Sequence, residues 1–194
     1  VADAYAEIQL DKWNDPWIPE STYPDMIPFP VEFTTSDPVS VFITGEQEYI
    51  WTDESFDRPV QENLVIYEIL VRDFSEQRTY KLIEDSLDYI ENLGVSAIEL
   101  MPVMEFNGND SWGYNTTFYF APDKAYGTRD DLKSLIDACH ERGIAVILDL
   151  VFNHSDQPNP FITMYWNDWV VAPNNPWFNV EAPHSMNWFY DWNH

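Results

Sequence analysis

From residue 64 onwards, apolar and polar residues follow the order strand, helix, strand, helix, strand. Residues 64–71 and 95–101 are apolar enough for strands, and residues 81–92 between them have the spacing of an amphipathic helix. A second helical pattern over 128–143 leads into the most apolar run of the sequence, residues 144–151. This order predicts the βαβ units of a parallel sheet.

Signals at the helix ends support these boundaries. Thr128 has Asp131 three residues later, which is the spacing of a capping box, and Gly94 and Gly143 follow the two helical patterns. The apolar positions that share a helical face are Ile83, Leu87 and Ile90 in the first helix and Leu132, Leu135, Ile136 and Cys139 in the second. Because free cysteines are usually buried, we expect Cys139 to be a structural thiol.

The run 144–151 is the segment around which the other elements are arranged. Its composition predicts a strand buried on both faces, as in a parallel sheet. One carboxylate, Asp149, interrupts the run, and burying it without a partner would be costly. Asn153 and His154 follow at the carboxyl end of the strand, where parallel α/β folds place their chemistry.

Residues 1–62 have a different pattern, in which seven prolines exclude long helices. Residues 31–33 and 39–43 are candidates for short strands. The tryptophans that we expect to pack this segment are Trp13, Trp17 and Trp51. We interpret residues 1–62 as the end of a small β domain followed by a linker.

The composition narrows the classes of ligand. There are 34 acidic and 9 basic residues, a formal charge of -25, which disfavours nucleic acids and anionic membranes as partners. The charge suits a neutral ligand or bound cations, and a highly solvated surface explains it equally well. The single cysteine excludes an intramolecular disulfide and a cysteine-based zinc site. No apolar stretch is long enough to cross a membrane.

Three segments resemble signatures of the α-amylase superfamily of glycoside hydrolases, family thirteen. Residues 149–154, Asp-Leu-Val-Phe-Asn-His, are similar to its first signature, and residues 94–102 are similar to its second barrel strand. Residues 112–114, Trp-Gly-Tyr, followed by Tyr-Gly-Thr at 126–128, resemble the loop that leads into its second helix. The segments occur in the order found in the family.

The resemblance implies an α/β fold, the (β/α)8 TIM barrel. Residues 63–154 would be the first three β/α units of the catalytic barrel. Residues 1–62 would be the end of an N-terminal β-sandwich-like domain with its linker, and residues 155–194 a truncated loop subdomain inserted after the third strand. The tryptophans of this loop, which either line a glucan cleft or pack the loop, are Trp166, Trp169, Trp177, Trp188 and Trp192.

The resemblance also implies roles for individual residues. His154 would donate a hydrogen bond to the sugar at the cleavage point, and Tyr114 would stack on the same ring, with Trp112 beside it in the substrate site. Asp149 would be a structural carboxylate of the site. Asn153 would offer an oxygen to calcium, the one cofactor that the resemblance suggests. The alternatives are an ordinary loop histidine at 154 and a core-packing tyrosine at 114.

The catalytic carboxylates are expected to be absent. Retaining glycosidases need a nucleophile and an acid/base, and the resemblance places these after later strands than the three recognised here. We therefore expect an inactive fragment of an extracellular or periplasmic enzyme that acts on α-1,4-glucans such as starch or glycogen, with no organic cofactor. The sequence leaves the oligomeric state open.

Several alternatives remain for the activity. Trp112 is more like the branching and debranching members, so an α-1,6-acting or glucanotransferase parent is the nearest one. A non-catalytic carbohydrate-binding relative is another. An unrelated, doubly wound α/β binding domain would need a phosphate-binding glycine loop after its first strand, and residues 72–76 contain no glycine.

Overall fold

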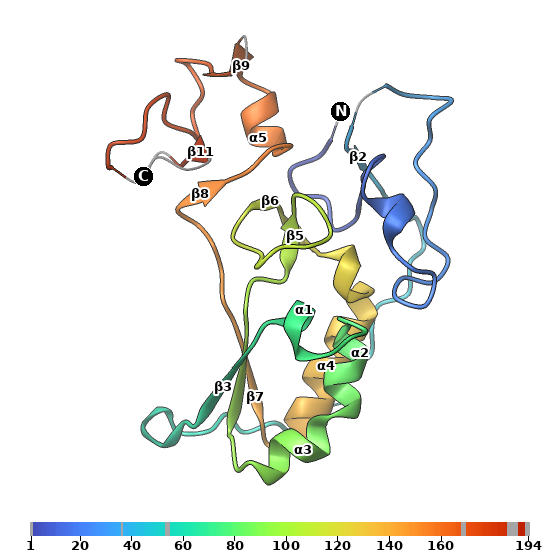
Figure 1. Cartoon of the computed structure of the whole chain (residues 1–194), viewed down its shortest axis with the longest axis vertical. Coiled ribbons are helices and arrows are strands. Elements are labelled where there is room, and N and C mark those ends of the chain that lie inside the picture. The colour runs from blue at the N-terminus through green and yellow to red at the C-terminus, as the bar shows by residue number, and fades with distance from the viewer. Residues whose placement is uncertain (1, 36, 53–54, 168–169, 186–189, 193–194) are drawn as a thin grey trace.

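A parallel three-stranded sheet with the strand order β3–β4–β7 lies in the lower half of the view in Figure 1. Its strands are β3 (Ile66–Ile69), β4 (Ala97–Leu100) and β7 (Ala145–Leu148). The structure is a computed structural model that describes residues 2–35, 37–52, 55–167, 170–185 and 190–192. The predicted series of parallel strands is confirmed, although each strand is shorter than predicted.

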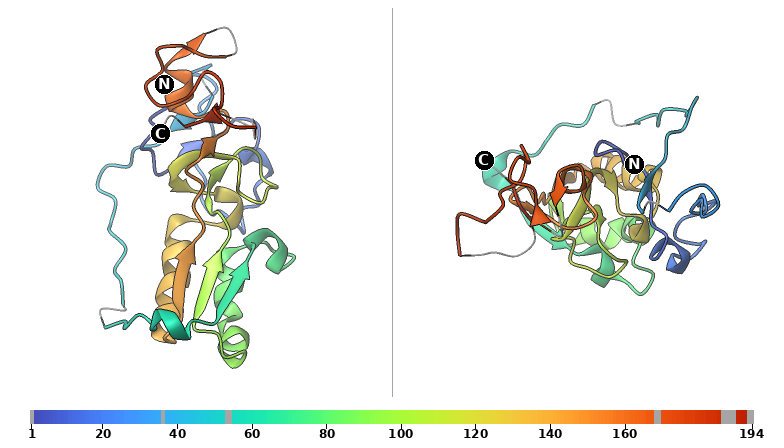
Figure 2. Two further views of the ribbon diagram at one scale, coloured as in Figure 1. Left: turned by 90° about the vertical axis from the view of Figure 1, so that its left-hand side faces the viewer. Right: turned by 90° about the horizontal axis from the view of Figure 1, so that it is seen from above.

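Helices cover one face of this sheet, as Figure 2 shows from the side. They are α2 (Tyr80–Asp85), α3 (Leu87–Asn92) and α4 (Arg129–Glu141), and a single turn, α1 (Val71–Phe74), follows β3. The sequence predicts one helix over 81–92, whereas the structure divides it at Ser86. The Ser86 hydroxyl donates to the Leu82 carbonyl at 2.7 Å, and this side-chain bond competes with the regular helical pattern.

Helix α4 has the ends that the sequence predicts. Thr128 and Asp131 form a capping box, and Gly143 follows the helix with a φ of 71°. Leu135 and Cys139 on its apolar stripe are 0% exposed. Burial raises the pKa of the Cys139 thiol to about 12, so the prediction of a structural thiol is confirmed.

The opposite face of the sheet has no covering layer within the described residues. In β3, Tyr67 and Ile69 face the helices, while Ile66 and Glu68 alternate with them and are exposed. Leu148, at the end of β7, is 40% exposed. The prediction that residues 144–151 are buried on both faces is therefore wrong for this chain, because helices pack against only one of them.

A β-hairpin lies beyond the carboxyl ends of the sheet strands (Figure 1). It consists of β5 (Met104–Phe106) and β6 (Thr116–Pro122), and the 3-10 turn η3 (Lys124–Tyr126) follows. This hairpin was not predicted from the sequence. The pairing register shifts twice within the hairpin, which interrupts the alternation by which strands are predicted.

The N-terminal segment has little regular structure. Its described residues form one ladder, between β1 (Gln9–Leu10) and β2 (Val39–Ser40), and the 3-10 turns η1 (Asp15–Trp17) and η2 (Gln61–Asn63). Residues 31–33 form a turn rather than the predicted strand, and only the first part of 39–43 is a strand. Prolines at 28, 30 and 38 remove backbone donors that such strands would need.

The tryptophans of this segment are not its packing material. Trp13, Trp17 and Trp51 are 67%, 81% and 43% exposed, so the prediction that they pack this segment is wrong. The reason is that the short ladder has no second layer of described residues to cover them.

The N-terminal segment is instead joined to the hairpin by a buried ion cluster. The Lys124 ammonium lies 2.5 Å from Glu105 Oε1 and 3.4 Å from Asp15 Oδ1, and all three side chains are at least 93% buried. Gln9 Nε2 donates to the same Glu105 oxygen at 2.5 Å. Because buried charges need partners, this cluster holds residues 9–15 against β5 and η3.

After β7 the chain enters an aromatic arm, defined here as residues 160–167, 170–185 and 190–192. The strand β8 (His154–Ser155) precedes it and pairs with β11 (Tyr190–Asp191). The arm itself contains α5 (Pro160–Thr163) and the pair β9 (Trp166–Asn167) and β10 (Val170–Val171). No described helix of the molecule is both long and apolar enough to span a membrane.

The aromatic arm has its own small core. Ile162, Val171 and Phe178 are buried there. Trp166, Trp177 and Trp192 pack around them, as the packing alternative predicts, whereas Trp169 and Trp188 lie outside the described residues.

Candidate functional site

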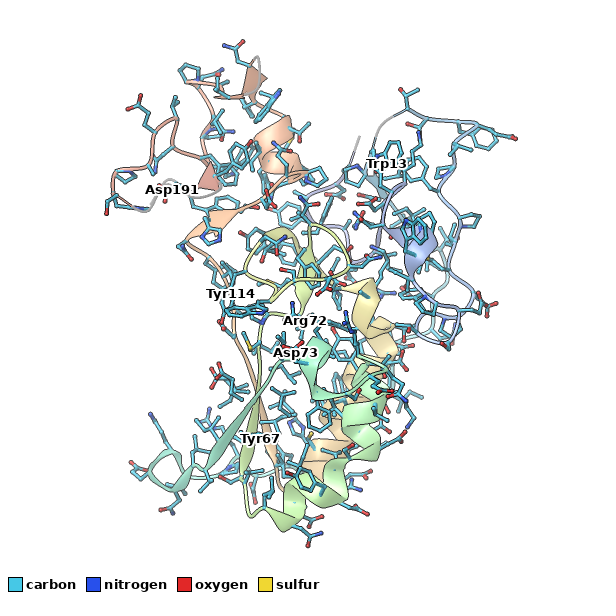
Figure 3. The ribbon with its side chains drawn as sticks, in the orientation of Figure 1. Trp13, Tyr67, Arg72, Asp73, Tyr114 and Asp191 are labelled. Atoms are coloured by element: carbon cyan, nitrogen blue, oxygen red, sulfur yellow. The ribbon has the colours of Figure 1, made fainter. Side chains whose placement is uncertain are left out.

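Several of the predicted site residues meet at the carboxyl end of the parallel sheet. Tyr114 lies in the loop that joins β5 to β6, and Figure 3 labels it at the same end of the sheet as Arg72 and Asp73, which follow β3. Asp149 comes directly after β7, and His154 begins β8. The site is thus built from the ends of strands and from the hairpin loop above them.

Gly113 allows the hairpin loop to lie directly on the end of β4. Its φ is 90°, and a Cβ added there would lie 2.3 Å from the Pro102 carbonyl oxygen and 2.8 Å from Pro102 Cβ. Any side chain would therefore collide with Pro102, two residues beyond the end of β4. This close approach brings the next residue, Tyr114, within reach of Asp149.

Tyr114 and Asp149 share a short hydrogen bond. The Tyr114 hydroxyl donates to Asp149 Oδ2 at 2.5 Å. This bond, together with partial burial and the charges of Asp149, Glu68 and Glu99, raises the pKa of Tyr114 to about 12. Asp149 therefore has a partner, as expected for a carboxylate within an apolar strand.

The imidazole of His154 is hydrogen-bonded at both nitrogens. Nε2 lies 2.6 Å from the Tyr114 carbonyl oxygen, and Nδ1 lies 2.7 Å from Nδ2 of Asn153. A carbonyl oxygen only accepts, so the Nε2 atom carries the proton, and Nδ1 then accepts from the Asn153 amide. The Nε2–H of His154 thus ties the imidazole to the loop that carries Tyr114.

The backbone of His154 is also held by the hairpin. The Tyr119 hydroxyl donates to the His154 carbonyl oxygen at 2.7 Å and accepts from Trp192 Nε1 at 2.9 Å. Sequence reasoning missed Tyr119. The β-branched and aromatic run Thr116 to Phe120 is typical of a strand and could have indicated the hairpin, although not this contact.

An ion-pair group that the sequence did not single out holds the loop against the end of β3. Arg72 pairs with Asp73 at 2.7 Å and with Asp110 at 3.1 Å, and Arg78 lies 3.4 Å from Asp110. The hydrogen bond to Arg72 lowers the pKa of the Asp73 carboxyl. Asp110 lies in the same loop as Tyr114, so these pairs help to fix where that loop lies.

The remaining two predicted site residues are exposed. Trp112 is 60% exposed in the loop just before Gly113. Asn153 is exposed and its amide faces His154. Among the described residues there is no cluster of three His, Cys, Asp or Glu side chains that could hold a metal ion. One asparagine oxygen does not satisfy the six to eight oxygens that calcium takes, so these residues alone do not fit the ion.

Comparisons with known proteins agree on one family. The family model for the alpha-amylase catalytic domain matches residues 29–193. Malto-oligosyltrehalose trehalohydrolase of Deinococcus radiodurans is 35% identical over 141 residues, which cover 68% of this chain and 24% of that protein. Alpha-amylase MalA of Haloarcula japonica is 35% identical over 176 residues, covering 87% of this chain and 26% of that protein.

A solved structure gives the same picture. The crystal structure of a putative alpha-amylase from Salmonella typhimurium superposes with a TM-score of 0.66 at 33% identity, over 80% of this chain and 24% of that one. The chain thus spans about a quarter of the length of these relatives.

Proposed function

Because the chain belongs to the alpha-amylase catalytic-domain family, we propose that it is part of a retaining glycoside hydrolase that acts on α-glucans. It has the TIM-barrel-type fold of that family. Its three parallel strands would be the first three β/α units of the barrel, and the exposed face of the sheet would become the barrel interior. The α-glucan would be an α-1,4-linked oligosaccharide or polysaccharide.

The observation that carries this proposal is the joint position of Tyr114, Asp149 and His154. The hydrogen bond to Asp149 fixes the Tyr114 hydroxyl, and His154 is bonded to the backbone of the same tyrosine. An aromatic ring next to an imidazole N–H suits a sugar, which offers an apolar ring face and hydroxyl groups. A sugar hydroxyl would take the place of the Tyr114 carbonyl as the acceptor of the Nε2 proton.

The proposed division of labour leaves catalysis to other parts of the protein. A retaining mechanism needs two carboxylates about 5–5.5 Å apart, and we assign neither to this chain. Asp149 would act by fixing Tyr114, and Trp112 would contact a neighbouring sugar. Asn153 would contribute one oxygen to calcium if other parts of the protein complete the site.

Sugar binding by the chain can be tested directly by calorimetry with maltotriose. We expect binding that is lost or greatly weakened in Tyr114→Ala and His154→Ala and that is absent for cellotriose, whose linkages are β. Tyr89→Ala is the matched control, since Tyr89 is a 56% exposed tyrosine on α3. Unchanged affinity in both site variants, or equal affinity for the two sugars, would contradict the proposal.

The hydrolase assignment has a separate test, which is to sequence the gene beyond codon 194. An Asp after the next strand and a Glu after the one following would support a glucan-acting enzyme. A stop codon, or strands without these carboxylates, would leave a carbohydrate-binding protein. A branching, debranching or glucanotransferase activity is the second candidate, favoured by Trp112 before Gly113, and product analysis of the whole protein would separate it from hydrolysis.

A further inference from the structure

We propose that Tyr119 and Trp192 position His154 and couple the aromatic arm to the sugar site. Neither residue is expected to contact the sugar. The inference rests on the proposed function, because it takes His154 as a sugar-binding residue.

The two partners of the Tyr119 hydroxyl determine which hydrogen bond it donates and which it accepts. The Trp192 indole can only donate and the His154 carbonyl can only accept, so the hydroxyl between them accepts at 2.9 Å and donates at 2.7 Å. Each bond polarises the other, which makes the pair stronger than two separate bonds. Burial raises the pKa of the Tyr119 hydroxyl, which keeps the donated proton on it.

The ring of Tyr119 fixes the same stretch of backbone by packing. Its centroid lies 5.8 Å from that of Phe152 at an interplanar angle of 20°, and 5.6 Å from that of Trp192. Phe152 is two residues before His154. The hairpin therefore holds His154 at two points: the imidazole through Tyr114 and the carbonyl through Tyr119.

Trp192 extends this contact into the aromatic arm. Its ring stacks on Phe178 with centroids 4.1 Å apart, and Phe178 is only 2% exposed in the core of the arm. Its backbone N–H donates to the Asn153 carbonyl at 3.2 Å. Its neighbour Asp191 lies opposite His154 in the antiparallel ladder of β11 and β8. A shift of the arm would therefore move the backbone of Asn153 and His154, and a shift of His154 would change the surroundings of the Trp192 indole.

The variant that isolates these hydrogen bonds is Tyr119→Phe, since it keeps the ring and removes the hydroxyl. It leaves the His154 carbonyl and the Trp192 indole without this partner. We expect the affinity for maltotriose to fall about 3- to 10-fold, which corresponds to the net contribution of about one neutral hydrogen bond. Trp192→Phe, which can still stack on Phe178, should give a similar loss.

The experiment is a maltotriose titration of the 194-residue chain followed by NMR, with 15N labels on tryptophan and histidine. In the wild type, the Trp192 indole N–H should shift together with the ring nitrogens of His154 and give the same dissociation constant. In Tyr119→Phe the shift of the indole N–H during the titration should be much smaller than in the wild type, because only the backbone contacts of Trp192 and Asp191 then remain. Tyr165→Phe is the matched control, since Tyr165 lies on the arm with its ring centroid 5.5 Å from that of Trp177, and this variant should behave as the wild type.

The outcomes separate the two proposals. If His154 responds to maltotriose, but the Trp192 indole does not and Tyr119→Phe binds as the wild type, the positioning inference is overturned and the proposed function stands. If maltotriose shifts neither resonance, the sugar site proposed for this chain is overturned. The histidine spectrum without sugar then still decides the inference, because unchanged ring nitrogen shifts of His154 in Tyr119→Phe would exclude a positioning role.

Discussion

The Tyr114 hydroxyl donates a 2.5 Å hydrogen bond to Asp149, which joins a hairpin loop to a residue 35 positions later, at the end of a strand. The bond gives the carboxylate of an otherwise apolar strand a partner. It also fixes the phenol at the carboxyl edge of the sheet, next to His154. The relationship makes the ionisation of Tyr114 a direct measure of whether the site is assembled.

We predict that Asp149→Asn lowers the pKa of Tyr114 from about 12 towards its ordinary value near 10. The folded chain keeps the tyrosine proton to a higher pH than the unfolded chain. The stabilisation is therefore complete below the unfolded pKa and is lost as the pH rises towards about 12. In Asp149→Asn the free energy of unfolding should therefore fall less between the unfolded pKa and about pH 12. NMR titration of ring-labelled tyrosine measures the pKa, with Asp85→Asn as the control, and an unchanged value would contradict the assignment.

The approach of Gly113 to Pro102 predicts a specific loss of stability. Gly113→Ala should lower the free energy of unfolding by about 1–3 kcal/mol through a positive φ and a collision with Pro102. Gly108 offers an unusually close control, because its φ is 92° against 90° for Gly113 and no atom lies within 4 Å of its added Cβ. Urea denaturation should show a larger loss for Gly113→Ala than for Gly108→Ala. Equal losses would mean that the contact with Pro102 is unimportant.

The buried ion cluster predicts that Lys124→Met is severely destabilising. Removing the ammonium leaves Glu105 and Asp15 buried without their cation, a loss of about 3–5 kcal/mol. Lys133→Met is the control, since Lys133 pairs with Asp130 at the surface of α4 and should cost less than about 1 kcal/mol. The double variant Lys124→Met, Glu105→Gln should recover part of the loss. Equal denaturation midpoints for Lys124→Met and Lys133→Met would refute the prediction.

The net charge of -25 predicts that salt stabilises the fold. Acidic residues outnumber basic ones 34 to 9, so repulsion outweighs the surface ion pairs. Raising KCl from 0.15 M to 1 M shortens the screening length from about 8 Å to about 3 Å. The melting temperature should rise by about 2–4 °C for each 1 kcal/mol of repulsion that is screened. Calorimetry with sorbitol at equal osmolality as the control would show whether the effect is electrostatic.

The sequence was sufficient for the elements whose signals are local. The capping box at Thr128 and the apolar stripe through Leu135 and Cys139 specify α4 within one stretch of chain, and the structure confirms them. The hairpin was missed because its shifted register hides the alternation of strand residues. The expected burial of Trp17 failed because burial depends on a second layer, which no pattern within the segment reports.

The residues of the candidate site could be predicted from the sequence, but the contacts between them could not. Family-like segments singled out Tyr114, Asp149 and His154, and their roles in binding sugar stay predictions until tested. The contacts between them depend on Gly113, whose close approach to Pro102 follows from the path of the chain. Tyr119 carried no sequence signal, because its role rests on a backbone carbonyl and on a tryptophan 73 positions later.

The buried Lys124 cluster has a practical consequence for anyone who shortens this protein. The residue pattern changes near residue 63, which makes that position an obvious start for a shortened, recombinantly expressed fragment. Such a fragment would lack Asp15, which pairs with Lys124, and Gln9, which donates to Glu105. It would also lack Ala6, which packs on Phe118 and Ala121. The base of the hairpin that presents Tyr114 would then be open to water. Residues 6–15 therefore belong in every recombinant version of this chain that is meant to bind a sugar.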